Sequence, residues 1–369
     1  MKELGAGAAS ADAKILIAEM AKALEAGDVA KVAKLAGKES LDPQTLSRLK
    51  ELTSSALKFR PDGIREMGEL ELNKRSRWVL ELEEKEPGRD RIFLDLRQEN
   101  KKWMIDKISL PPAAGEALAQ SNSPDSLDVA DTFLQALMKQ NFEFARTLVD
   151  PSSISDAKIA GLCILFEEGE YQLRKTKPLR FMFERKNTIN YLANLETRDS
   201  KQNAQFAINL KKPEGASKWI VSEINLDQLL ADYARRIAGG DIYYAPLVKN
   251  PAGGDTIALY FEFDEDEINP RTQRQLEIVT KILRSDPGKK ITLSGHADAM
   301  GTDEYNNSLS SRRADVIRDH LAKAGVSSAQ IITIAKGASQ PRRPNATETG
   351  ADNPEGRRAN RRTEIYLDF

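Results

Sequence analysis

An acidic residue at the end of a predicted strand and a basic residue inside the next predicted helix are the residues best placed to bind a charged ligand. Asp298 follows a strand predicted over Lys290–His296. Arg313 lies in a helix predicted from about Asp303 to Ala324, and at roughly 100° per residue it falls in the middle of that helix's apolar face. The face consists of Leu309, Val316, Ile317, Leu321 and Ala324.

An arginine on a core-facing helix position needs an anion. Burying an unpaired charge costs several kcal/mol, so Arg313 must meet a carboxylate from the protein or from a ligand, whereas Arg312 turns toward the edge of the stripe. Asp298 is the obvious protein candidate, because the carboxyl end of its strand and the helix face point at the same crevice. Such a site suits a zwitterion, whose ammonium group Asp298 would bind and whose carboxylate Arg313 would bind in bidentate fashion.

The sequence around these two residues resembles the signature of the OmpA-like peptidoglycan-binding domain. The match is carried by Gly295-His-Ala-Asp298, Gly301, Tyr305-Asn306, Leu309-Ser310 and Arg313-Ala314. It covers roughly Asp255 to Phe369, including an opening strand Ile257–Phe263 and a closing segment Gly356–Leu367 that looks like the family's last loop and strand.

The resemblance implies a function as well as a fold. In that family the aspartate and the arginine clamp the free amino-acid end of diaminopimelate in the cell-wall stem peptide, which gives these roles to Asp298 and Arg313. Asn306 and Arg361 are then expected to assist, and Gly301 to belong to the binding loop. Two departures, Ala297 in place of a common threonine and Met300 in place of a small polar residue, leave the loop contacts to the ligand open.

Composition excludes several other classes of function. The 369 residues are 40% hydrophobic with a net charge of −1, so no overall field attracts nucleic acid, and the arginine pairs near the C-terminus are local. Of these, Arg357 and Arg358 are interpreted as solvated. The two histidines and the single Cys163 give too few ligands for a metal site beside Asp298, and no cofactor or catalytic group is expected.

No stretch approaches the roughly 20 consecutive apolar residues that cross a bilayer. The first residues lack the apolar core of an export signal, which conflicts with a wall-binding domain unless a leader is missing. A missing leader is the preferred interpretation. We therefore expect a periplasmic protein, associated with the cell wall or outer membrane of a Gram-negative bacterium.

The N-terminal two thirds contain two similar segments. Lys102–Leu110 resembles Lys218–Leu226, and each is predicted to be the final strand of its segment. Ala23–Leu35 resembles Ala136–Leu148, and each is predicted to form a helix, a turn and a second helix. Alternating stretches between these landmarks predict antiparallel strands, so each segment is predicted to be α+β. This order resembles nuclear transport factor 2-like, or cystatin-like, domains, in which a curved sheet wraps around helices.

The predicted fold class is therefore α+β, with two tandem cone-like repeats of helices and antiparallel sheet followed by an OmpA-like βαβαβ-type α/β sandwich. The predicted domains are residues 10–112, 125–237 and 255–369, joined by Pro111–Asp125 and Gly239–Gly254. A loop from Gly337 to Gly356, rich in proline, is long enough to be mobile and to shape the rim of the pocket.

The leading hypothesis is a non-enzymatic envelope protein that binds peptidoglycan and anchors or presents its repeats, which would bind an envelope protein or peptide. The alternative is an envelope enzyme or ligand-binding protein with its site in one of the cone-like repeats. Acidic residues of the repeats mostly alternate with apolar strand positions, as on solvated sheet faces, which favours the first hypothesis.

Overall fold

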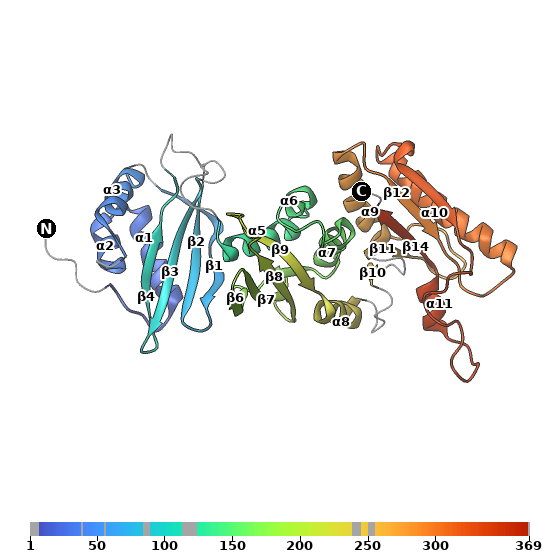
Figure 1. The fold of residues 1–369 in the computed structure, drawn as a ribbon, viewed down its shortest axis with the longest axis horizontal. Helices are drawn as coiled ribbons and strands as arrows, with labels where there is room; N and C mark the ends of the chain where they lie inside the picture. Colours follow the sequence, from blue (N-terminus) through green and yellow to red (C-terminus); the bar gives the residue numbers. More distant parts are fainter. Residues whose placement is uncertain are drawn as a thin grey trace. The chain divides into compact units, whose positions relative to one another are not determined.

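The computed structural model describes residues 7–37, 40–54, 57–83, 89–112, 124–237, 245–249 and 255–367. Contacts divide the chain into two compact units, whose helices and strands are labelled in Figure 1. The first combines Met1–Asp131, Leu173–Leu195 and Ala207–Ile220, and the second combines Thr132–Gln172, Glu196–Phe206 and Val221–Phe369. The three-domain scheme drawn from the sequence stays a prediction.

The chain begins with three short helices, α1 (Ala13–Glu25), α2 (Val29–Ala36) and α3 (Pro43–Leu52). An aspartate precedes each helix, and its side chain accepts a hydrogen bond from a free backbone N–H of the first turn. The capping residues are Asp12, Asp28 and Asp42.

A four-stranded antiparallel sheet follows, in the order β1 (Phe59–Glu71), β2 (Arg75–Leu82), β3 (Arg91–Glu99) and β4 (Lys102–Ser109). Its inward side chains join those of the helices in one apolar core, which includes Leu16, Met20, Leu80, Leu94 and Ile105. The predicted order of helices followed by sheet is present here. β1 was not predicted, because Pro61 and Gly63 interrupt its apolar alternation and its pairing with β2 carries several register shifts.

The next segment again places helices before strands. Its helices are α5 (Ser126–Met138), α6 (Phe142–Arg146) and α7 (Asp156–Glu168). Its strands are β5 (Tyr171–Leu173), β6 (Leu179–Arg185), β7 (Thr188–Thr197), β8 (Asn203–Lys211) and β9 (Ile220–Asn225), with sheet order β5-β7-β8-β9 and β6 paired to β7. β4 and β9 coincide with the two similar final stretches of the sequence. The duplication and the nuclear transport factor 2-like kinship remain predictions.

Helix α8 (Asp227–Ile237) leads to a third, mixed sheet in the order β10-β11-β14-β12-β13. Its strands are β10 (Leu247–Lys249), β11 (Asp255–Tyr260), β12 (Ile291–Gly295), β13 (Ile331–Ala335) and β14 (Arg362–Leu367). β12 and β13 are parallel, and the other neighbours run antiparallel. The helices of this region are α9 (Pro270–Ser285), α10 (Asp303–Lys323) and the short α11 (Pro354–Asn360), with a 3₁₀ turn at Ser328–Gln330.

Two local predictions for this region were wrong. The predicted joint Gly239–Gly254 contains strand β10, which pairs with β11, while residues 113–123 of the first joint, 238–244 and 250–254 lie outside the described residues. The predicted closing loop contains helix α11, which begins at Asn353 and Pro354, a capping side chain and a first-turn proline. In contrast, α10 and β12 lie within one residue of their predicted bounds.

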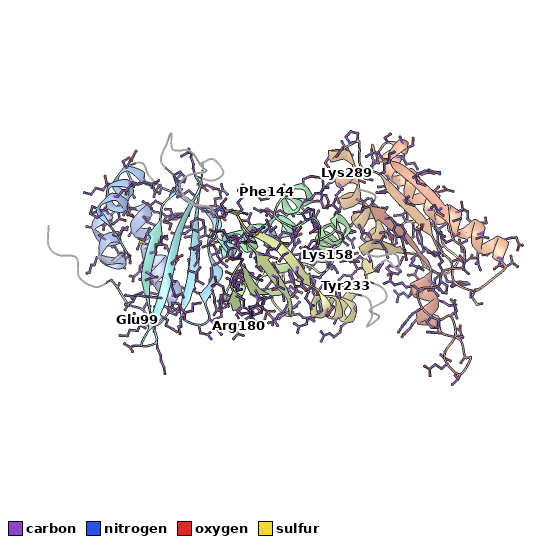
Figure 2. All side chains as sticks on the ribbon, in the orientation of Figure 1. Glu99, Phe144, Lys158, Arg180, Tyr233 and Lys289 are labelled. Carbon is purple, nitrogen blue, oxygen red and sulfur yellow. The ribbon has the colours of Figure 1, made fainter. Side chains whose placement is uncertain are left out.

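Within the second unit, the third sheet packs against helix α7. Buried side chains of α7, α8 and the strands β10 and β11 form one small core of Leu165, Tyr233, Val248, Ala258 and Tyr260. Figure 2 labels Tyr233 on α8 and Lys289 just before β12, two buried residues of this unit. None of the helices in the described ranges is long and apolar enough to span a membrane.

Candidate functional site

Arg313 is fully buried on α10, and backbone carbonyl groups hold its guanidinium. Its Nε donates to the carbonyl of Glu265 (2.8 Å), Nη1 to that of His296 (3.1 Å) and Nη2 to that of Glu262 (3.2 Å). The guanidinium also lies 5.2 Å from the ring centre of Phe261. Three carbonyl dipoles thus fix the plane of the guanidinium.

Arg313 forms no ion pair with the described residues, so the expected direct pairing with Asp298 is absent. Burial, followed by the nearby charge of Arg361, lowers the pKa of Arg313 to about 10. The carboxylates of Asp298, Asp266 and Asp264 favour the cation from a distance, but they do not offset the cost of its burial. An anion entering the site would offset that cost.

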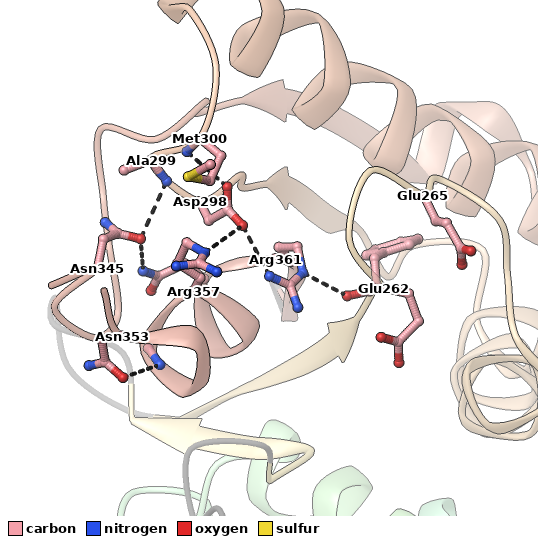
Figure 3. Close-up of polar contacts among 12 residues, drawn as sticks. Glu262, Glu265, Asp298, Ala299, Met300, Asn345, Asn353, Arg357 and Arg361 are labelled. Atoms are coloured by element: carbon pink, nitrogen blue, oxygen red, sulfur yellow. Dashed lines mark hydrogen bonds and ion pairs between the residues drawn. The ribbon is translucent and has the colours of Figure 1, made fainter. Parts of the chain in front are cut away.

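Asp298 follows β12 and pairs with Arg357 of helix α11 and with Arg361, the residue that follows this helix (Figure 3). Its Oδ2 accepts a hydrogen bond from Arg361 Nη1 at 3.0 Å and lies 3.9 Å from Arg357 Nε, while Oδ1 accepts one from the backbone N–H of Met300 at 3.0 Å. The side chain of Arg357 is only 17% exposed. The interpretation of Arg357 as a solvated charge was therefore wrong, because the sequence pattern did not show the helix that turns it toward Asp298.

The five residues selected from the sequence line one cavity of about 260 Å³. Its lining consists of Phe263, Asp264, Asp298, Met300, Gly301, Tyr305, Asn306, Leu309, Arg313 and Arg361. Asp298 and Arg313 thus face one cavity without forming an ion pair with each other. That is the geometry expected for a zwitterion, although the binding roles themselves remain predictions.

Asn306 and Gly301 shape the cavity beside these charges. Asn306 is 2% exposed, and within the described ranges its side-chain amide makes no hydrogen bond. Gly301 has φ +98°, a conformation that disfavours other residues, and a Cβ there would lie 3.2 Å from the ring of Tyr305. The amide of Asn306 lines the cavity, where it can offer a ligand a donor and an acceptor.

Large apolar side chains form the rim of the cavity. Phe263, Met300 and Tyr305 are 58%, 50% and 43% exposed. The Tyr305 hydroxyl donates to the carboxylate of Asp264, which holds the ring at the rim. The sequence did not point to Phe263 and Asp264 as site residues; they lie three and four residues beyond the end of β11.

His296 contributes its backbone more than its ring. The residue is 1% exposed, its carbonyl accepts from Arg313, and in the described part of the chain neither ring nitrogen has a hydrogen-bond partner. Burial, helped by the charge of Arg362, lowers the pKa of His296 to about 3. Among the described residues no group of three or more His, Cys, Asp or Glu side chains could hold a metal ion.

A profile of the OmpA family matches residues 260–354, the part of the chain that holds β12, α10 and most of this cavity. Residues 260–354 form an OmpA-family domain. The N-terminal segments lie outside the matched residues.

Curated relatives match the same C-terminal region. The chain is 37% identical over 83 residues to the peptidoglycan-associated lipoprotein of Pseudomonas aeruginosa, covering 22% of this chain and 49% of the relative. It is 35% identical over 108 residues to outer membrane porin F of Pseudomonas fluorescens, covering 29% of this chain and 31% of that protein. The chain thus spans about half the length of these relatives, or less.

A solved structure is similar as well. The crystal structure of the peptidoglycan-associated lipoprotein from Burkholderia pseudomallei has 29% sequence identity and a TM-score of 0.27, covering 30% of this chain and 89% of that one.

Proposed function

We propose that this chain is a non-catalytic cell-envelope protein that binds peptidoglycan non-covalently through the diaminopimelate of the stem peptide. The observation that carries the proposal is the cation of Arg313, buried without an ion pair to the described residues in a cavity that Asn306 and Asp298 also line. A bound carboxylate would contact Arg313 and Asn306 at once. The names of the relatives, a peptidoglycan-associated lipoprotein and an outer membrane porin, support the envelope as the location.

The free end of diaminopimelate is an α-amino acid, which carries an ammonium and a carboxylate on one carbon. In the proposed complex the carboxylate binds Arg313 and Asn306, and the ammonium binds Asp298. Arg361 keeps the Asp298 carboxylate in place through the 3.0 Å hydrogen bond. The methylene chain of the ligand would then leave the cavity across the apolar rim of Phe263, Met300 and Tyr305.

We further propose that the domain attaches the N-terminal segments to the wall in the periplasm, where they meet an envelope protein or peptide. The interior of the first segment supports a non-catalytic role for that segment, because Leu, Ile, Ala and Trp side chains fill the space between its helices and its sheet. An enzyme would need polar groups at that place.

Co-sedimentation with sacculi that contain diaminopimelate tests the proposal. The intact chain is expected to sediment with the sacculi, and Asp298→Asn and Arg313→Gln are expected to remain in the supernatant. Arg318→Gln is the matched control, because Arg318 lies on the same helix and its ion pairs with Asp315 and Asp319 are at the surface. Circular dichroism checks the fold of each variant.

Two results would contradict the proposal. If the intact chain stays in the supernatant, peptidoglycan is not the ligand. If a folded Asp298→Asn variant sediments as well as the control, the cavity is not the binding site.

A further inference from the structure

The loop between β13 and α11 is tied to α11 by one buried asparagine. Asn360 is 0% exposed, and its Oδ1 accepts from the backbone N–H groups of Arg342 (2.7 Å) and Arg343 (3.0 Å). Its Nδ2 donates to the carbonyl of Arg343 and to Oδ1 of Asn345, both at 2.9 Å. The amide therefore uses both donors and both acceptor positions, which specifies asparagine at this place.

Asn345 passes this restraint to the loop that carries Asp298. The Oδ1 of Asn345, which accepts from Asn360, also accepts from the backbone N–H of Ala299 at 3.3 Å (Figure 3). Ala299 directly follows Asp298. A chain of hydrogen bonds thus runs from the buried end of α11 to the backbone of the Asp298 loop.

The start of α11 holds the same stretch of loop. Asn353 Nδ2 donates to the carbonyl of Pro344 at 2.9 Å, and a Cβ on Gly356 would lie 2.1 Å from that carbonyl oxygen. Residues 342–345 therefore lie directly on α11, the helix that contains Arg357 and ends just before Arg361. Arg357 and Arg361 hold the side chain of Asp298. Asn345 holds the backbone N–H of the next residue, Ala299.

We propose that Asn360 and Asn345 are positioning residues that fix the Asp298 loop for ligand binding. This inference rests on the proposed function and adds to it two residues that do not line the cavity. Without the Asn345 contact, the N–H of Ala299 loses its partner and the loop gains conformational freedom. Ordering the loop on binding then costs entropy, which lowers the affinity for the ligand.

Asn345→Ala is the decisive variant, because Asn345 is only half-buried and its loss leaves the Asn360 hub in place. The matched control is Thr347→Ala: Thr347 lies two residues further along, and its hydroxyl contacts only Thr349 and Ala351 among the described residues. Asn345→Asp is the conservative variant, since it keeps an acceptor oxygen toward both Ala299 and Asn360. Asn360→Ala is expected to act in the same direction as Asn345→Ala.

Two measurements are made on the full chain. Calorimetric titration with meso-diaminopimelate should show roughly tenfold weaker binding for Asn345→Ala, the effect of about one hydrogen bond. Thr347→Ala and Asn345→Asp should bind nearly as well as the wild type. Without ligand, hydrogen exchange of a peptide covering residues 298–301 should be faster in Asn345→Ala and unchanged in Thr347→Ala.

The outcomes separate this inference from the proposed function. If the wild type binds and Asn345→Ala binds equally well, or if Thr347→Ala loses as much affinity, the positioning role is wrong while the function stands. If no variant and no wild-type chain binds either diaminopimelate or sacculi, the proposed function fails. Even if nothing binds, unchanged hydrogen exchange of residues 298–301 in Asn345→Ala would show that the positioning role is wrong.

Discussion

At the scale of single residues, the site contains polar groups that the fold itself does not satisfy. Arg313 has carbonyl groups in place of a counter-ion, and the Asn306 amide faces the cavity without a hydrogen bond in the described part of the chain. The burial of Arg313 costs free energy of folding, and a ligand with a carboxylate would recover part of it. Unsatisfied groups are therefore the marks of function here, because packing alone would favour apolar residues.

Replacing Asn306 by leucine tests this conflict between stability and binding. Leucine has a similar volume and leaves no polar group in the buried position, so the free energy of unfolding should stay equal or rise by up to about 1 kcal/mol. Binding to sacculi should fall at least about tenfold, because the ligand carboxylate loses a donor. Urea unfolding and co-sedimentation measure the two effects. A clear loss of stability would show that the amide has a structural role instead.

His296 predicts a pH dependence of stability. Its pKa is about 3 in the folded chain against an ordinary value of 6.5, so between these values the unfolded state binds the proton and the folded state does not. The stabilising contribution is complete above about pH 6.5 and is lost as the pH falls toward 3. His296→Leu removes this term, so its urea midpoint should decrease less between pH 7 and pH 4.5 than that of the wild type. Equal decreases in both proteins would contradict the assignment.

At the scale of elements, a glycine sets the distance between β12 and α10. A Cβ on Gly295 would lie 1.9 Å from the backbone carbonyl oxygen of Ser310, a contact that requires the strand and helix to move apart. That movement would also displace Asp298, which lies three residues beyond the end of β12, and Arg313, which lies three residues beyond Ser310 in α10. The glycine of the signature is thus explained by close packing.

Gly295→Ala should lower the free energy of unfolding by about 1 to 3 kcal/mol, the usual cost of forced overpacking. Gly288→Ala is the control, because there the nearest atom to the new Cβ is an oxygen of the exposed Asp286 side chain at 3.1 Å. Urea unfolding compares the two variants. Equal stabilities would mean that the strand and helix separate without cost.

Some of these elements could be predicted from the sequence and others could not. Helix α10 and its buried arginine were predictable, because a helix of this length repeats its apolar face several times. Helix α11 was not, since seven residues give barely two turns and its arginines resembled a solvated loop. The pairing of Asp298 with Arg357 and Arg361 followed from that helix and was missed with it. Strand β10 has three residues, too few to show alternation.

At the scale of the whole molecule, the OmpA-family domain is packed against helices that precede it in the chain. Glu168 at the end of α7 has a side chain that is 3% exposed, and it accepts hydrogen bonds from Arg271 and Gln275 of α9, at 2.7 and 2.8 Å, and from Tyr233 of α8 at 2.6 Å. Lys289, whose side chain is 2% exposed, pairs with Glu143 of α6. Gly161 of α7 allows Leu247 of β10 to approach closely.

These contacts predict that helices α6 to α8 and the OmpA-family domain unfold as one cooperative unit. Arg271→Met leaves the Glu168 carboxylate buried without its cation, which should cost about 3 kcal/mol. In scanning calorimetry of the full chain, this variant should show an additional transition at lower temperature, as the helices separate from the domain before it melts. Arg274→Met is the control, because Arg274 is an exposed residue of the same helix.

A double variant, Glu168→Leu with Arg271→Met, removes both charges together and should recover part of the lost stability, since no unpaired carboxylate remains. Binding to sacculi should be unchanged in all of these variants, because none of the replaced residues lines the cavity. If Arg271→Met melts as the control does, the contacts are too weak to couple the two parts. The domain would then bind the wall independently of the helices, and its orientation on them would have no part in presenting the N-terminal segments.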